Sequence, residues 1–187
     1  MKLAAGAALA ALILAGCARV PLAPPSPAMD SIVAARSAGI APVSLGTFRL
    51  APGLPASVDE SVTARTNTFY SPYGSSFAQY LKEALAADLR AAGLLEPQAQ
   101  TVVEGWLTDS RLDVPTGASS AAVAARFVVT RSGKTLYDRE LRAESRWQAS
   151  FVGVEAVPDA INRYGLLYRK LAADLVADPA FRAAVRP

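Results

Sequence analysis

The chain contains a single cysteine, Cys17, which directly follows an apolar N-terminal segment. This segment opens with the charged residue Lys2, continues as an apolar run from Leu3 to Leu14 and ends in two small residues, Ala15 and Gly16. A charged start, a short apolar run and small residues before a cleavage point are the parts of a secretory signal. The run is too short to span a bilayer, which takes about 20 apolar residues. We therefore expect residues 1–16 to be removed, which leaves about 170 residues to fold, enough for one ordinary domain.

The residues around the cleavage point add a second property. Leu14, Ala15, Gly16 and Cys17 resemble the lipobox of bacterial lipoproteins. The resemblance implies cleavage after Gly16, a diacylglycerol on the thiol of Cys17 and acylation of the new amine. Because two or more acyl chains hold a protein stably, we expect attachment to the membrane without a spanning segment. Ala18 stands where the enterobacterial sorting rule associates Asp with the inner membrane, which favours the outer membrane of a Gram-negative bacterium and a domain facing the periplasm.

The composition argues against several classes of site. The chain has no histidine, and its one cysteine is committed to lipid. Zinc and most transition metals therefore lose their preferred ligands, and the commonest general base and the thiol nucleophile are both missing. We expect no metal, no cofactor and no catalytic residue. The net charge is +3, from 19 Lys and Arg against 16 Asp and Glu without a basic stripe, so we do not expect nucleic-acid binding.

The residues after Cys17 predict a tether. Four prolines lie between positions 21 and 27, and Ala, Ser and Gly dominate as far as Ala41. Pro-rich sequence favours an extended conformation of about 3.1 Å per residue, so a dozen residues would hold the domain roughly 35 Å from the bilayer. We therefore predict a signal peptide over 1–16, a lipidated cysteine with a flexible tether over 17–41, and a periplasmic domain over 42–187.

Two helices are predicted inside that domain. Ser76 and Gln79 fit a capping box, in which the Ser76 hydroxyl accepts from the amide of Gln79 and the Gln79 side chain reaches back. Apolar residues then recur at helical spacing until Gly93, which suits a helix end. A last helix is expected to start near Pro158, which suits a first turn, and to be interrupted at Asp178-Pro179.

The remaining periodicity predicts strands. They are expected over 43–50, with Gly46 as a bulge, weakly over 62–70, over 101–114 and 121–130, and in the segment that returns from a hairpin at Ser132-Gly133. The order of elements predicts a single α+β domain. It comprises a mostly antiparallel sheet of four to five strands, with two helices packed on one face.

A few local motifs accompany this order of elements: Ala92-Gly93 at a helix end, Thr108-Asp109-Ser110 at the end of a strand, a hairpin at Gly133, and Asp159-Ala160-Ile161-Asn162 in the last helix. On these residues, the chain from Phe77 to Val185 resembles the YajG family of outer-membrane lipoproteins. It more loosely resembles LptE, which plugs the lipopolysaccharide-insertion barrel, and the auxiliary lipoproteins of ABC transporters. These resemblances imply a partner-binding role and supply no catalytic motif.

Two surfaces are candidates for contact with a partner. In the strand over 121–130, the bulky residues Val123, Phe127 and Val129 alternate with a small, apolar set: Ala122, Ala124, Arg126 and Val128. If the helices cover the bulky face, the second set forms an apolar patch that marks a contact site, unless the tether or residues 62–73 cover it. The aromatic segment containing Phe69, Tyr70 and Tyr73 is either an interface or a plug over the sheet edge.

An enzymatic alternative rests on carboxylates. Glu104, Asp109 and Asp113 would support glycoside chemistry only if two of them converge to about 5–9.5 Å. We therefore predict a non-catalytic outer-membrane lipoprotein whose periplasmic domain binds or supports another envelope component, with an envelope protein as its partner. The first alternative is an auxiliary protein that binds or transports lipid, which would need an apolar cavity between helices and sheet. The second is a hydrolase acting on glycan or lipid.

Overall fold

The computed structural model describes residues 19–37 and 39–187; the predicted signal peptide and Cys17 lie outside the described residues. In chain order the described elements are β1 (Arg19–Pro21), α1 (Met29–Ser37), β2 (Ser44–Leu50), α2 (Ser57–Glu60), β3 (Val62–Ala64), β4 (Asn67–Tyr70), α3 (Phe77–Ala92), β5 (Thr101–Asp113), β6 (Gly117–Arg131), β7 (Lys134–Ala149), α4 (Gly153–Ala177) and α5 (Pro179–Ala184).

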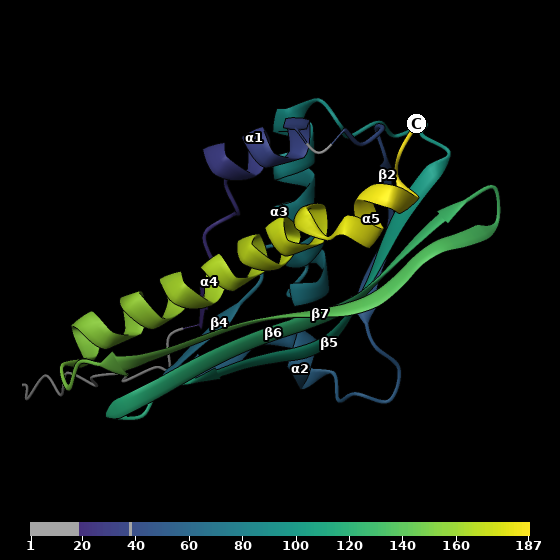
Figure 1. Cartoon of the computed structure of the whole chain (residues 1–187). Coiled ribbons are helices and arrows are strands. Elements are labelled where there is room, and N and C mark those ends of the chain that lie inside the picture. The colour runs from purple at the N-terminus through teal and green to yellow at the C-terminus, as the bar shows by residue number, and fades with distance from the viewer. Residues whose placement is uncertain (1–18, 38) are drawn as a thin grey trace, which may run out of the picture.

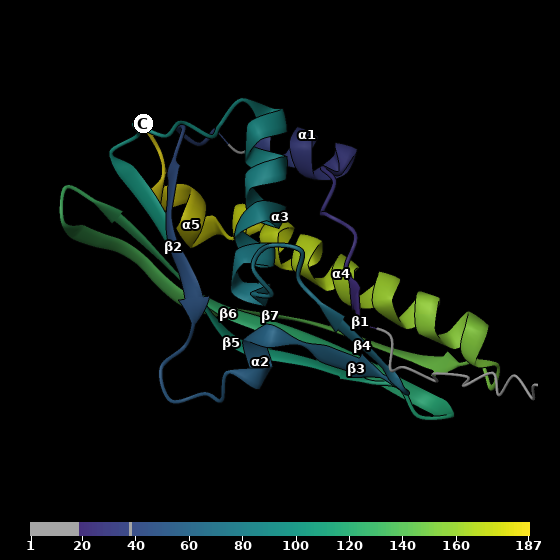
Figure 2. The same ribbon diagram turned by 180° about the vertical axis from the view of Figure 1, so that it is seen from behind.

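The strands form two sheets. The larger has the order β2-β5-β6-β7, in which β2 is parallel to β5 and the other pairs are antiparallel. Helices α3 and α4 lie on one face of this sheet (Figure 1), and the view from behind shows the same layering (Figure 2). The prediction of a single α+β domain with two helices on one face is confirmed.

The smaller sheet, of order β1-β4-β3, was not predicted. Residues 62–70 form an antiparallel hairpin instead of one strand, because the chain reverses at Arg65, whose φ of 55° lies in the left-handed region. The third strand, β1, comes from the predicted tether and pairs in parallel with β4.

The predicted tether is therefore corrected within the described residues. Leu22 and Ala35 are buried in the core, and helix α1 packs on α3. The Arg36 guanidinium donates to the carbonyls of Ala91 and Ala92 at the end of α3, and the Asp88 carboxylate accepts from the amide of Ala28 at 3.1 Å. The folded domain thus begins before residue 42, since isolated apolar residues among the prolines are enough to fasten this segment.

Helix α3 begins and ends where the sequence predicts. The Ser76 hydroxyl accepts from the Gln79 amide at 3.1 Å, and Gly93 follows the helix with a left-handed φ of 77°. The predicted capping box is not closed, however, because the Gln79 side chain donates to the carbonyl of Phe48 at 2.6 Å. Instead, Asp59 accepts from the Ala78 amide at 2.7 Å. The start of α3 is therefore fastened to both β2 and α2.

Helix α4 starts at Gly153, before the predicted start at Pro158. Pro158 lies close to the exposed beginning of the helix, where its missing amide costs only one hydrogen bond, to the carbonyl four residues earlier. The predicted interruption at Asp178-Pro179 is confirmed: Asp178 accepts from the Ala180 amide at 2.7 Å and caps α5.

The core fills the space between the sheet and the helices. The Phe48 ring lies so close to Gly105 that a Cβ there would approach it to 2.6 Å, and it also meets Phe127 edge-on. Beneath α4, three buried hydroxyls bond to one another: Ser110 to Tyr164 at 2.6 Å, Ser110 to Tyr168 at 3.2 Å, and Tyr164 to Tyr168 at 2.8 Å. We call Ser110, Tyr164 and Tyr168 the hydroxyl ring.

Candidate functional site

The candidate site is the face of the large sheet that points away from α3 and α4, which we call the outer face. A register shift between Leu107 and Asp109 places a bulge in β5 at Thr108. Beyond the bulge, the pairing of β5, β6 and β7 brings outward residues into three rows, each with one residue from every strand: Asp109, Ala124 and Arg142; then Arg111, Ala122 and Glu144; then Asp113, Ser120 and Arg146. In every row an acid and a base face each other across a small residue of β6.

The small residues let the charged groups meet. Strands two positions apart in a sheet are separated by about 9.6 Å, which is too far for direct contact between short side chains. Arg142 on β7 nevertheless donates to Asp109 on β5 at 2.7 Å, in a row whose middle residue is Ala124. Arg111 donates to the same oxygen of Asp109 at 2.7 Å. Asp109 therefore joins two guanidinium groups from different strands.

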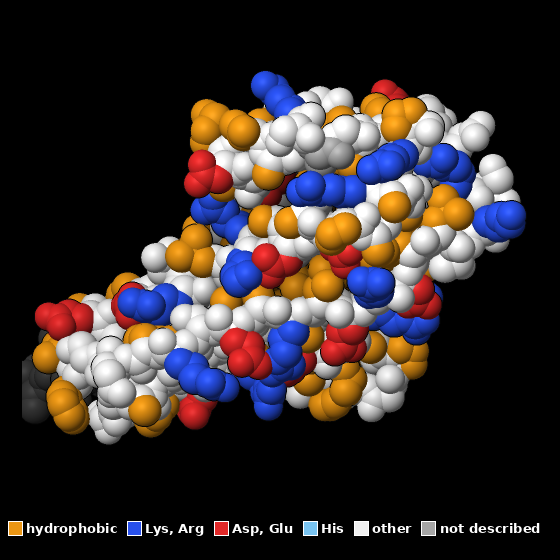
Figure 3. Space-filling model, in the orientation of Figure 1, with side chains coloured by type: hydrophobic (Ala, Val, Ile, Leu, Met, Phe, Trp, Pro, Cys, Tyr) orange, Lys and Arg blue, Asp and Glu red, His pale blue; other side chains and the backbone are white. Residues whose placement is uncertain are grey.

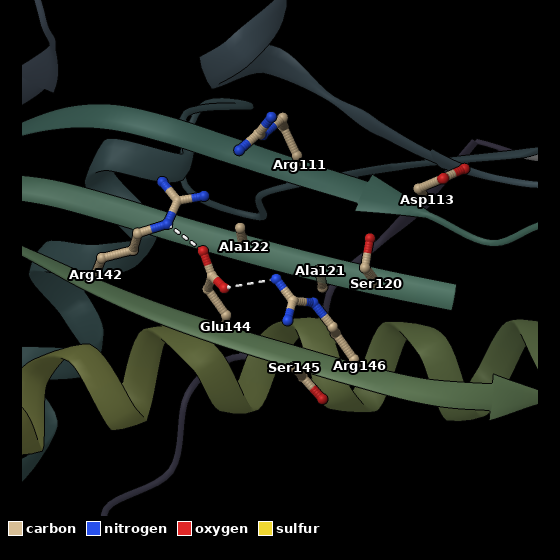
Figure 4. A pocket seen from close by; sticks show the side chains of 9 residues that line it. All are labelled: Arg111, Asp113, Ser120, Ala121, Ala122, Arg142, Glu144, Ser145 and Arg146. Carbon is tan, nitrogen blue, oxygen red and sulfur yellow. Dashed lines mark hydrogen bonds and ion pairs between the residues drawn. The ribbon is translucent and has the colours of Figure 1, made fainter. Parts of the chain in front are cut away.

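The network continues along β7. Glu144 lies between two arginines, accepting from the Nε of Arg142 and lying 3.5 Å from the Nη2 of Arg146 (Figure 4). The hydrogen bonds to Glu144 and Asp109 raise the pKa of Arg142, and the hydrogen bond from Arg142 lowers the pKa of Glu144. The hydrogen bond between Arg142 and Glu144 thus favours the charged forms of these two groups. We call Arg111, Asp109, Arg142, Glu144 and Arg146 the ion-pair network.

A shallow groove of about 360 Å³ runs beside this network. Its floor includes Ser120 and Ala122, and its walls carry the side chains of Arg111 and Arg146, which are 68% and 83% exposed. Figure 4 shows the three arginines of the network around this floor, with Glu144 between two of them. The groove therefore offers exposed guanidinium groups whose neighbours are already paired, an arrangement suited to binding a polar or charged partner.

The structure corrects one expectation about the residues predicted as a partner surface. Ala122, Ala124 and Val128 are only 8%, 0% and 9% exposed, so they do not form an open apolar patch. Long side chains of β5 and β7 meet in the row of Ala124, where Arg142 bonds to Asp109. Arg126, the fourth member of the predicted set, is exposed and makes a two-pronged hydrogen bond to Asp138 at 2.6 and 2.5 Å.

The outer face also carries Trp106, which is not among the residues predicted as a partner surface. The Trp106 ring lies 5.3 Å from the guanidinium carbon of Arg49 and 6.0 Å from that of Arg126. Its outward position follows from the alternation in β5, but its arginine neighbours depend on which strands pair.

The aromatic candidates Phe69, Tyr70 and Tyr73 are not gathered on one open surface. Phe69 is buried in the core, Tyr70 lies under the guanidinium group of Arg19, and the Tyr73 ring packs 6.2 Å from that of Tyr80. This arrangement favours the plug over the interface.

The carboxylates considered for catalysis do not converge. Asp109 and Asp113 are four residues apart on one strand, about 13 Å, beyond the 5–9.5 Å range of glycosidase carboxyl pairs. Glu104 lies on the other side of the bulge from both. The Ser76 hydroxyl serves as a helix cap.

Among residues 19–37 and 39–187, no group of His, Cys, Asp and Glu is placed to hold a metal ion. Within the same residues, no helix is long and apolar enough to cross a membrane.

Among the comparisons with known proteins, a solved structure supports the fold. No family model matches the chain, and no curated protein matches its sequence. A Xanthomonas campestris protein with the family model DUF330 has a similar structure, with a TM-score of 0.55, 10% identity and coverage of 89% of this chain and 93% of that one. A candidate lipoprotein from Caulobacter crescentus has a TM-score of 0.47 and 12% identity, with coverage of 85% of this chain and 99% of that one. A minor lipoprotein from Acinetobacter baumannii has a TM-score of 0.46 and 16% identity, with coverage of 74% of this chain and 89% of that one.

Proposed function

We propose that this chain is a lipid-anchored lipoprotein of the outer membrane of a Gram-negative bacterium, and that its outer face docks another envelope protein without catalysis. The anchor is inferred from Leu14, Ala15, Gly16 and Cys17. The docking role rests on one observation, the ion-pair network across β5, β6 and β7. Membership of the YajG family stays a prediction.

The network favours recognition for two reasons. Its side chains are already held by one another, so a partner would order few of them on binding, and this lowers the entropic cost of association. Its charges also alternate from row to row, so a partner with the opposite alternation would bind in one register and not in the shifted one. A surface with charges of only one sign would not distinguish between these two registers.

The alternative of a lipid carrier has less support. A carrier needs an apolar cavity between helices and sheet, but this space is filled by the rings of Phe77, Tyr80, Tyr164 and Tyr168, whose centroids lie 5.1–6.0 Å apart in four pairs. We therefore propose a protein partner in preference to a lipid ligand.

The anchor is tested by Cys17→Ser. This variant should take up no labelled palmitate and should accumulate as an uncleaved precursor or free in the periplasm, because the acylated thiol is absent. The unchanged chain, expressed in the same cells, should be labelled and should fractionate with the outer membrane. Palmitate in the Ser variant would overturn the assignment of Cys17.

The docking face is tested in cells with a photo-crosslinking residue at Ser120, on the floor of the groove. A discrete crosslinked product is expected, and it should be lost when Arg111→Glu and Arg146→Glu reverse the two exposed guanidinium groups. Lys134→Glu is the control, since it makes the same charge change as either single reversal, at the exposed β6–β7 hairpin. Equal loss with Lys134→Glu, or unchanged crosslinking in the double variant, would contradict docking at this face.

A further inference from the structure

The connection between β7 and α4 and the first turn of α4 expose large apolar side chains. Phe151, Val152 and Val154 are 81%, 52% and 80% exposed, and we call them the apolar tip. Phe151 and Val154 are the most exposed of the large hydrophobic residues in the part of the chain that the structure describes. In Figure 3, orange hydrophobic side chains lie at the left-hand end of the molecule, where α4 begins.

The apolar tip is held in place by its backbone. The two terminal nitrogens of Arg65, in the turn between β3 and β4, donate to the carbonyls of Phe151 at 3.1 Å and Ser150 at 2.5 Å. The Ser150 hydroxyl accepts from the Val152 amide at 3.1 Å and donates to Glu155 at 2.9 Å. The apolar side chains are therefore directed outward by a fixed loop.

This loop lies close to the position from which the lipid anchor extends. Arg19 pairs with Thr68, three residues after Arg65, so at most about 10 Å of chain separates Thr68 from Arg65. Cys17 precedes Arg19 by two residues, at most about 7 Å of chain. Because β1 is paired to the domain, no long tether separates Cys17 from the Arg65 turn that holds the apolar tip.

We propose that the apolar tip enters the headgroup region of the bilayer that holds the acyl chains of Cys17. This inference rests on the proposed lipid anchor. Aromatic and aliphatic side chains at the surface of an anchored protein gain by moving from water into that interface. The positive charge of Arg65, which holds the tip, suits anionic headgroups, whereas Glu155 is bonded to Ser150. The domain therefore lies against the membrane at the start of α4 and extends its β6–β7 hairpin away from it.

The single cysteine makes a direct test possible. In mature protein purified from a bacterium that processes lipoproteins, Cys17 carries lipid, so Phe151→Cys supplies one free thiol for a polarity-sensitive fluorophore. Leu136→Cys is the matched control, because Leu136 is also an exposed hydrophobic residue, 41% exposed, and lies near the opposite end of β7. Both proteins are placed in vesicles of equal parts phosphatidylethanolamine and phosphatidylglycerol.

In these vesicles the emission of the fluorophore at 151 should shift to the blue. Its intensity should also fall when the lipids carry brominated acyl chains, whereas the fluorophore at 136 should emit as in water. Mass spectrometry of the same samples reports acylation. Acylated protein whose 151 fluorophore emits like the one at 136 would overturn membrane contact by the tip and leave the anchor intact. Protein without acyl chains would overturn the anchor and, with it, this inference.

Discussion

On the inner face of β6, Val123, Phe127 and Val129 belong to the core that α3 and α4 close, whereas on the outer face Ala122 and Ala124 lie beneath charged groups from β5 and β7. Both faces exclude water from β6, but by different means. The inner face uses apolar volume, and three hydroxyls there bond to one another in the hydroxyl ring. The outer face uses long side chains whose charged ends stay at the surface.

This difference predicts how each face responds to a new charge. Inside, a carboxylate has no route to water and no cation to pair with, so burial dominates the free energy. Outside, a carboxylate can displace its covering side chain and reach solvent, so the cost is limited to rearrangement. Small residues in a sheet can therefore indicate crossing ion pairs as well as an uncovered contact patch.

The largest expected effect is that of Val123→Glu. Val123 is fully buried, and an unpaired charge in its place should destabilise the fold by about 3–5 kcal/mol, a large share of the 5–15 kcal/mol of an ordinary domain. Urea unfolding followed by circular dichroism measures the loss. A midpoint close to that of the unchanged protein would show that the inner face is not a closed core.

Ala124→Glu, one residue away on the outer face, should cost less, about 1–2 kcal/mol. The new carboxylate would compete with Asp109 for Arg142 and could extend toward water. The same unfolding measurement applies, and the two variants are controls for each other. If Ala124→Glu destabilised the domain as much as Val123→Glu, both faces would be internal, and the docking surface would have to lie elsewhere.

The hydroxyl ring permits a smaller test of the inner face. Tyr164→Phe removes one hydroxyl and leaves Ser110 and Tyr168 at 3.2 Å, so we expect a loss of about 1 kcal/mol in the free energy of unfolding. Tyr73→Phe, at a half-buried ring, is the matched control and should change the midpoint less. Equal effects of the two variants would mean that the ring does not contribute to stability.

The sequence predicts those parts of this comparison that depend on local signals. Ser76 and Gly93 mark α3, and alternation marks β5, β6 and β7. The outer-face network depends on the bulge at Thr108, because strict alternation from Val103 would place Asp109 inward and only the one-residue shift turns it outward. The alternation of residues in this strand does not mark where the bulge lies. The strands and helices can therefore be predicted from the sequence, but the three rows of outward residues across β5, β6 and β7 cannot.

The sequence also does not predict where the folded domain starts, because the contacts that fix this start are non-local. Strand β1 has only three residues, and its pairing with β4 leaves no periodic pattern in the sequence. The prolines beside it are typical of a linker. The packing of Leu22 and Ala35 and the hydrogen bonds of Ala28 and Arg36 show that this segment is folded, and all of these contacts depend on distant partners.

The smallest expected effect concerns Glu144→Gln on the outer face. The hydrogen bond from Arg142 lowers the pKa of Glu144 in the folded protein, so the ionised carboxylate stabilises the fold above the pKa that Glu144 has in the unfolded chain. This contribution is lost as the pH falls through the lower pKa of the folded protein. The variant should therefore be slightly less stable than the unchanged protein near neutral pH and equally stable in acid. The midpoints of urea unfolding at neutral and acid pH measure this difference in stability, and added salt should reduce the difference at neutral pH.

Glu140→Gln, on the same strand and face, is the matched control. A difference between the Glu144 variant and the unchanged protein that persisted in acid would mean that Glu144 acts through packing, and the outer face would then resemble the inner one.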